Sequence, residues 1–190
     1  MKTRIIAVAL AICLAGPALA DDVTDQIDEA VKAYNKKDMP TAIAALEAAA
    51  NMLRQKRADT YGALLPPPPS GWTADDVQTV SAGMAMMGGG ASASRKYHNG
   101  NDTVTVSILA DSPLLQVMTN FASSGFAAAS GVRTQIVNGR RTIFMKDEGS
   151  YTSIVADKVL VRVEGRGQSE DTLKKFLTAV DFAAVEQAAK

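Results

Sequence analysis

Apolar positions near the start of the chain repeat with the period of an α-helix. Val23, Ile27, Val31 and Tyr34 follow one another at spacings of four, four and three residues. This spacing places the four side chains on one face of a helix, because an α-helix turns once every 3.6 residues. The segment "NKKDMPT" then interrupts the repeat. The pattern therefore predicts a first helix that ends before this segment.

A second helix is expected to begin at Asp38. Aspartate is a favourable N-cap, and Pro40 is tolerated in the first turn because its missing N–H has no helical partner there. The apolar face of this helix is expected to carry Ile43, Leu46, Ala50 and Leu53. Small residues that allow a partner helix to approach closely are Ala42, Ala45 and Ala49. Residues 21–63 are thus predicted to form a helical hairpin.

After residue 72 the period changes to that of a β-strand. In "TVTVSIL" apolar and polar residues alternate, which is typical of a strand with one buried face. The turn dipeptide Asn99-Gly100 separates this strand from "ASASRKY". Turn residues also separate four further candidate strands, "RTQIV", "RTIFMK", "SYTSIVA" and "VLVRVEG".

Two helices are predicted among these strands. One is "DSPLLQVMTNF", with Pro113 at its first position, and the other is "SEDTLKKFLTAV", with Ser169 as N-cap. The expected core stripe of the last helix is Leu173, Phe176, Leu177 and Val180. The order of elements predicts the α+β class: an antiparallel sheet of about five to six strands with two helices packed on it, preceded by the N-terminal helical hairpin.

The segment "LLPPPPSGW" lies between the helical and the strand-like parts. Four prolines cannot continue a helix, and as polyproline II they would form a stiff spacer of roughly 12 Å. Trp72 is expected to be the first anchor of the following domain, because an aromatic side chain of this size is usually mostly buried. The expected organisation is a signal peptide at 1–20, the helical hairpin at 21–63, a proline-rich joint at 64–71 and an α+β domain at 72–190.

The first twenty residues have the pattern of a signal peptide. Lys2 and Arg4 precede an apolar run that is too short to cross a bilayer, and Ala18-Leu19-Ala20 supplies the small residues of a cleavage site. Cleavage is expected after Ala20, with Sec-type export to a bacterial periplasm. A lipoprotein signal at Cys13 is the alternative, although Ile12 stands where a small residue is expected.

The composition excludes several classes of partner. The chain has 20 basic and 20 acidic residues, so loss of Lys2 and Arg4 leaves 18 against 20 and a net charge of −2. Such a chain has no general attraction to nucleic acid or anionic lipid. The basic run "RQKR" at 54–57 is interpreted as a solvated helix face or as a contact with acidic lipid headgroups. No second apolar run is long enough for a membrane span.

Two parts of the chain resemble known families. "EAVKAYNKKDMPTAIAALEAAANML" resembles a single tetratricopeptide-type repeat, with Ala30, Asp38, Ala42, Leu46 and Ala49 at the spacing of that family. One repeat cannot bury its own apolar face. The resemblance therefore implies that the hairpin packs on the rest of the protein, on another copy or on a partner.

The C-terminal 120 or so residues are similar to small exported proteobacterial α+β proteins, through "LPPPPSGW", "ASRKY", "TVTVSILADSPLL" and "SEDTLKKFLTAVD". The strand order also looks like that of the small modules of the photosystem PsbP and yeast Mog1 type. Members of the PsbP-like group are mostly accessory or binding proteins. The resemblance implies such a role and brings no catalytic residues with it.

The segment "GMAMMGGG" is the most unusual in composition. Met84, Met86 and Met87 lie close together, and thioethers are ligands suited to Cu(I). His98, the single histidine, would complete such a site if the segment pairs with the next strand. In the alternative interpretation the methionines fill the core, the glycines form a loop and His98 is an exposed turn residue.

No catalytic residue and no cofactor is assigned from the sequence, because no nucleophile–base pair or carboxylate pair stands out by its spacing. The expected function is that of a non-enzymatic periplasmic accessory or binding protein that acts through protein or ligand contacts. The partner would be another periplasmic protein, or a second copy bound through the helical hairpin. The alternative function is a periplasmic carrier of Cu(I) or a small ligand that uses the methionine-rich loop.

Overall fold

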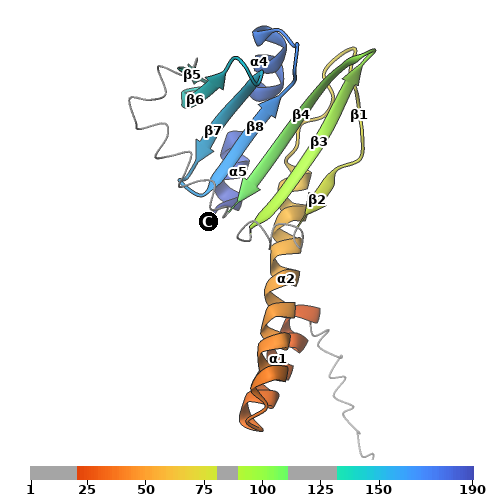
Figure 1. Cartoon of the computed structure of the whole chain (residues 1–190), viewed down its shortest axis with the longest axis vertical. Coiled ribbons are helices and arrows are strands. Elements are labelled where there is room, and N and C mark those ends of the chain that lie inside the picture. Colours follow the sequence, from red (N-terminus) through yellow and green to blue (C-terminus); the bar gives the residue numbers. More distant parts are fainter. Residues whose placement is uncertain (1–20, 81–89, 111–131) are drawn as a thin grey trace, which may run out of the picture.

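The protein has the expected α+β architecture. The structure is a computed structural model that describes residues 21–80, 90–110 and 132–190. In these ranges a helical hairpin projects from one end of an antiparallel sheet (Figure 1). The predicted helix in "DSPLLQVMTNF" and the three clustered methionines lie outside the described residues. The fold class and the N-terminal hairpin predicted from the sequence are confirmed.

The hairpin consists of α1 (Asp22–Asn35) and α2 (Met39–Ala63). The side chain of Asp38 accepts a hydrogen bond from the backbone N–H of Thr41 at 3.3 Å, which confirms it as the N-cap, and Pro40 lies in the first turn as predicted. At a rise of 1.5 Å per residue, α1 is about 21 Å long and α2 about 37 Å. The second helix therefore extends well beyond the first, towards the sheet.

In the part of the chain that the structure describes, the sheet has eight antiparallel strands in the order β1-β3-β4-β8-β7-β6-β5, with β2 also paired to β3. The bounds are β1 Thr73–Ala74, β2 Gln78–Val80, β3 Ala91–Asn99, β4 Asp102–Ala110, β5 Val132–Val137, β6 Arg140–Met145, β7 Ser150–Val155 and β8 Val159–Glu164. The count exceeds the predicted five to six because β1 and β2 have only two and three residues. Segments this short show no alternation that a sequence pattern could reveal.

The turn predicted at Asn99-Gly100 joins the two longest strands of the sheet. Asn99 at the end of β3 pairs with Asp102 at the start of β4, and Gly100 between them has φ 59°. Glycine adopts this left-handed conformation without steric cost. Along β4, Val104, Val106 and Ile108 are completely buried, which confirms the predicted alternation.

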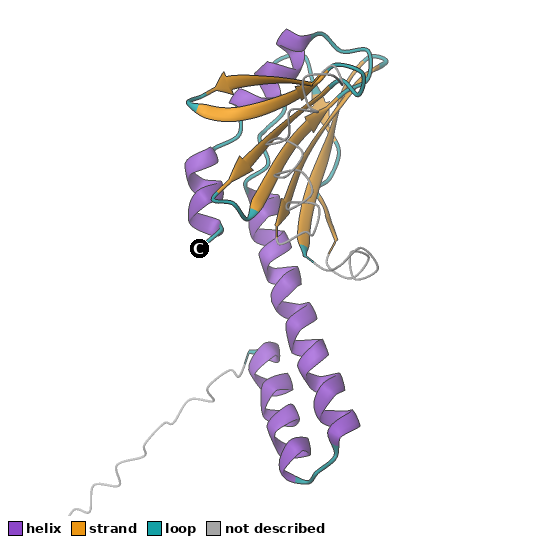
Figure 2. Cartoon of the chain, turned by 60° about the vertical axis from the view of Figure 1, so that its left-hand side comes forward, coloured by secondary structure: helices purple, strands orange, loops and turns teal. Residues whose placement is uncertain are grey.

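Helices cover the face of the sheet to which these β4 residues point (Figure 2). They are α4 (Glu170–Thr178), α5 (Phe182–Ala188) and the last part of α2. The Ser169 side chain caps α4 by accepting from the Thr172 N–H at 3.1 Å, as predicted. The four predicted core residues of this region, Leu173, Phe176, Leu177 and Val180, are all buried. The short helix α5 was not predicted from the sequence.

The end of α2 and the proline-rich segment pack directly on the sheet domain. Tyr61 is completely buried, and the Tyr97 hydroxyl donates to the Pro66 carbonyl oxygen at 2.6 Å. Trp72 is half-buried and meets the ring of Phe176 edge-on at a centroid distance of 4.9 Å. The helix α2 therefore runs without a break from the hairpin into the core. Both α2 and the proline-rich segment fix the orientation of the hairpin relative to the sheet.

Candidate functional site

The two helices of the hairpin meet through small side chains. The buried residues between them are Val23, Ala30 and Ala33 of α1, and Ala42, Ala45 and Ala49 of α2. Because alanine ends at Cβ, the two backbones can approach closely along this contact. The predicted role of the three alanines of α2 is confirmed. Of the predicted apolar stripe on α1, only Val23 is buried in the contact.

The larger apolar side chains of the hairpin remain exposed. Ile27, Val31 and Tyr34 of α1, and Met39, Ile43, Leu46 and Leu53 of α2, have exposed fractions between 42% and 63%. If a fully exposed residue of this size presents roughly 200 Å², these seven residues together expose roughly 700 Å². The largest apolar patch of a typical monomer is about 300–600 Å².

These seven residues lie on one side of the hairpin. Each residue advances about 100° around the axis of its helix. Measured around that axis from the buried residues of the same helix, the seven exposed residues lie about 50–130° away. The sense of this rotation is the same in both helices. In an antiparallel pair, flanks rotated in the same sense point to the same side. We call this surface the hairpin face. The opposite side carries Asp22, Glu29, Thr41 and Ala48.

His98 lies next to a carboxylate near the end of β3. Its Nε2 is 3.1 Å from a carboxylate oxygen of Asp75, and its Nδ1 is 3.5 Å from the Thr103 hydroxyl. The side chains of His98 and Asp75 are 37% and 55% exposed, so water competes with this pair. In the described ranges no three His, Cys, Asp or Glu side chains are grouped so that they could hold a metal ion. Met84, Met86 and Met87 lie outside those ranges, so the predicted Cu(I) site stays a prediction.

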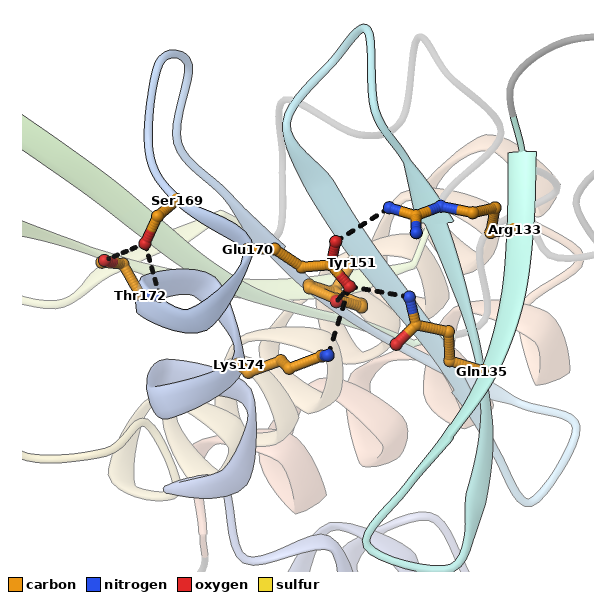
Figure 3. Close-up of polar contacts among 7 residues, drawn as sticks. All are labelled: Arg133, Gln135, Tyr151, Ser169, Glu170, Thr172 and Lys174. Atoms are coloured by element: carbon orange, nitrogen blue, oxygen red, sulfur yellow. Dashed lines mark hydrogen bonds and ion pairs between the residues drawn. The ribbon is translucent and has the colours of Figure 1, made fainter.

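A polar cluster is centred on Glu170, the first residue of α4 (Figure 3). Its carboxylate accepts hydrogen bonds from the Gln135 amide, the Tyr151 hydroxyl and Arg133, each at 2.8 Å. Lys174 lies 3.2 Å away on the next turn of the helix. The hydrogen bonds from Gln135 and then Tyr151 lower the pKa of Glu170 to about 2. Burial, with the neighbouring carboxylate, raises the pKa of Tyr151.

The geometry of this cluster suits a role in holding the fold together. A carboxylate with a pKa of about 2 is a weak general base at neutral pH, because efficient acid–base groups have a pKa near the working pH. The donors come from β5 and β7, and the acceptor from α4. Glu170 therefore ties the far edge of the sheet to the helix that covers it.

A polar pocket of about 550 Å³ lies where the ends of β4 and β8 meet the turn between β6 and β7. Arg162 donates to Glu148 at 2.8 Å, and its Nε lies 2.9 Å from Glu164 without hydrogen-bond alignment, so that contact is electrostatic. Gln168 donates to Asp102 at 2.8 Å. Most of the polar groups in the walls are thus already paired with one another. The pocket has no dominant charge that would select a ligand.

The basic run at 54–57 also takes partners within the protein. Lys56 forms an ion pair with Asp21 at 2.5 Å, and Arg54 donates to the Asn51 side chain at 2.9 Å. Gln55 donates to the Thr79 hydroxyl at 3.0 Å, from α2 across to β2. The contacts of Lys56 and Gln55 link this part of α2 to the start of α1 and to the sheet.

Comparison with known proteins found no matching family model, no matching curated protein and no matching solved structure. No helix in the described parts of the chain is long and apolar enough to cross a membrane. The functional proposals below therefore rest on the residues and geometry of this chain.

Proposed function

We propose that the protein is a non-enzymatic accessory protein of the periplasm that acts through protein contacts made by the hairpin face. The supporting observation is the roughly 700 Å² of apolar surface that seven residues expose on one side of the hairpin. Apolar area of this extent is stabilised when a partner removes it from water. The signal-peptide pattern of residues 1–20 supports export.

The construction of the hairpin supports this role. The Lys56–Asp21 ion pair joins the base of α1 to α2, and the Asp38 cap supports the turn. The same α2 is anchored in the core by Tyr61, whose hydroxyl donates to the Ala188 carbonyl oxygen at 3.3 Å. A surface held in place before binding loses less conformational entropy on association.

The polar groups of the described residues support a role outside catalysis. Glu170 holds α4 to the sheet, and its low pKa keeps it ionised at neutral pH. His98 and Asp75 form an exposed pair at the end of a hairpin of strands. A catalytic histidine would instead be held by a carboxylate in a site that excludes water and would face a nucleophile.

Site-specific photo-crosslinking in the cells that produce the protein tests the proposal. A photoreactive benzoylphenylalanine would replace Leu46 on the hairpin face, and in a matched control Thr41 on the opposite side of the same helix. We expect covalent protein adducts, identified by mass spectrometry, from position 46 and none from position 41. Equal labelling at both positions, or no protein adduct from position 46, would refute the proposal.

A further inference from the structure

We infer that the hairpin face is covered by a second copy of this chain, bound antiparallel to the first, so that two hairpins form a four-helix bundle. The inference rests on the proposed function, since it names the partner of the hairpin face. Such a pair is related by a two-fold axis, and the same surface on each copy is then self-complementary.

The exposed area matches what such an interface needs. Two hairpin faces of roughly 700 Å² each would bury roughly 1,400 Å² together, and specific protein interfaces bury about 1,200–2,000 Å². The seven exposed residues include one tyrosine and one methionine, both enriched in interfaces, and no charged residue. Burial of the face therefore leaves no unpaired charge at the centre of the bundle.

The charged residues of α1 lie away from the hairpin face. The first half of the helix and its N-cap carry Asp21, Asp22, Asp25, Asp28 and Glu29, and its end and the turn carry Lys32, Lys36 and Lys37. At about 100° per residue, those within α1 point to the back or to the opposite side of the hairpin. Two copies can therefore bury the hairpin face and leave these charges in water.

The arrangement of the domains favours the antiparallel orientation of the two hairpins. The sheet lies at one end of α2, and the turn of the hairpin lies at the other (Figure 2). Antiparallel hairpins place the two sheets at opposite ends of the bundle, so the sheets do not compete for space. Parallel hairpins would place both sheets side by side.

The mass in solution provides the first test. We would measure the full chain, with Cys13→Ser to remove its only thiol, by size exclusion with light scattering at about 50 μM. The expected mass is about twice the 20.0 kDa of the single chain. Leu46→Glu should weaken association at least about 30-fold, and the matched Thr41→Glu should leave it unchanged. Both substituted residues are exposed, and circular dichroism confirms that each variant is folded. A monomeric parent chain would overturn the inference.

Cysteine cross-linking tests the orientation. Leu46 lies near the middle of the hairpin face on α2, close to the proposed two-fold axis. Leu46→Cys should therefore form a disulfide with its own copy on oxidation, because Cα atoms within about 7 Å can be bridged. Leu53→Cys should cross-link only when Met39→Cys is also present. A cross-link from Leu53→Cys alone, or none from Leu46→Cys, would overturn the antiparallel arrangement.

The two experiments separate this inference from the proposed function. A monomer in solution, together with a photo-adduct between position 46 and a different protein, would leave the proposed function standing and overturn the self-association. A monomer without any photo-adduct would overturn both.

Discussion

Glu170 should stabilise the fold in a pH-dependent way. In Glu170→Gln the four donors around the carboxylate, from Arg133, Gln135, Tyr151 and Lys174, lose a charged acceptor. Hydrogen bonds to a charged group are stronger than those to a neutral one, so the variant is expected to be less stable at neutral pH.

The magnitude follows from the pKa. A fall from the ordinary value of 4.5 to about 2 corresponds to about 3.4 kcal/mol if the whole difference is realised in the free energy of unfolding. The side chain of Glu170 is 30% exposed, so solvent screens part of this interaction. We therefore expect Glu170→Gln to lower the free energy of unfolding at pH 7 by about 1–2 kcal/mol.

The pH dependence has a definite sign. The pKa of Glu170 is lowered in the folded state, so its contribution is fully present above the ordinary value of 4.5 and is lost as the pH falls towards 2. Urea unfolding followed by circular dichroism, from pH 7 down to pH 2.5, should show the parent chain and the variant converging over this range.

The matched control is Asp171→Asn, a neighbouring exposed carboxylate in the same first turn of α4. It should change the free energy of unfolding at pH 7 by less than about 0.5 kcal/mol. Equal stabilities of the parent chain and Glu170→Gln at pH 7, or a difference that persists unchanged at pH 2.5, would refute the reasoning.

Two further substitutions test how the end of α2 and the proline-rich segment join the sheet. Tyr97→Phe removes the bond to the Pro66 carbonyl, so the parent chain should be more stable by about 1–2 kcal/mol at pH 9. Burial raises the pKa of Tyr97 to about 12, so this advantage of the parent chain should decline as the pH rises from 10 to 12. Urea unfolding measures the difference in stability between the two proteins, and a difference that stays constant over this pH range would contradict the prediction. Gly62→Leu should cost about 1–3 kcal/mol in thermal unfolding, because a Cβ at Gly62 would lie 2.9 Å from Val77 Cγ1. The exposed control Ala63→Leu should cost less than about 0.5 kcal/mol, and equal losses would contradict packing of α2 on β2.

Local signals in the sequence predicted much of the fold. The cap at Asp38, the turn at Asn99-Gly100 and the cap at Ser169 all lie where the structure has them. Each signal depends on residues within about four positions, which is the range over which helix caps and tight turns form. The short strands β1 and β2 lack such a signal and were missed. They are strands because their backbones pair with β3, which follows them in the chain.

The Glu170 cluster could not be predicted from the sequence. Ser169 and Glu170 indicated the start of a helix, and this was correct. Gln135 and Tyr151, which lie 35 and 19 residues earlier, carried no signal that they would donate to Glu170. Only the pairing of β5, β6, β7 and β8 brings these side chains to the N-terminus of α4.

The hairpin shows the same division most clearly. Its sequence by itself determined two amphipathic helices and the turn at Asp38, because helical periodicity and capping act within one or two turns. The sequence pattern assigned Ile27, Val31 and Leu46 to apolar faces but did not show what covers those faces. Only the tertiary structure decided that the alanines fill the contact between the helices and that the larger side chains point outward. The reason is geometric: two helices that approach closely through Cβ atoms bury a narrow stripe and leave its flanks to a partner.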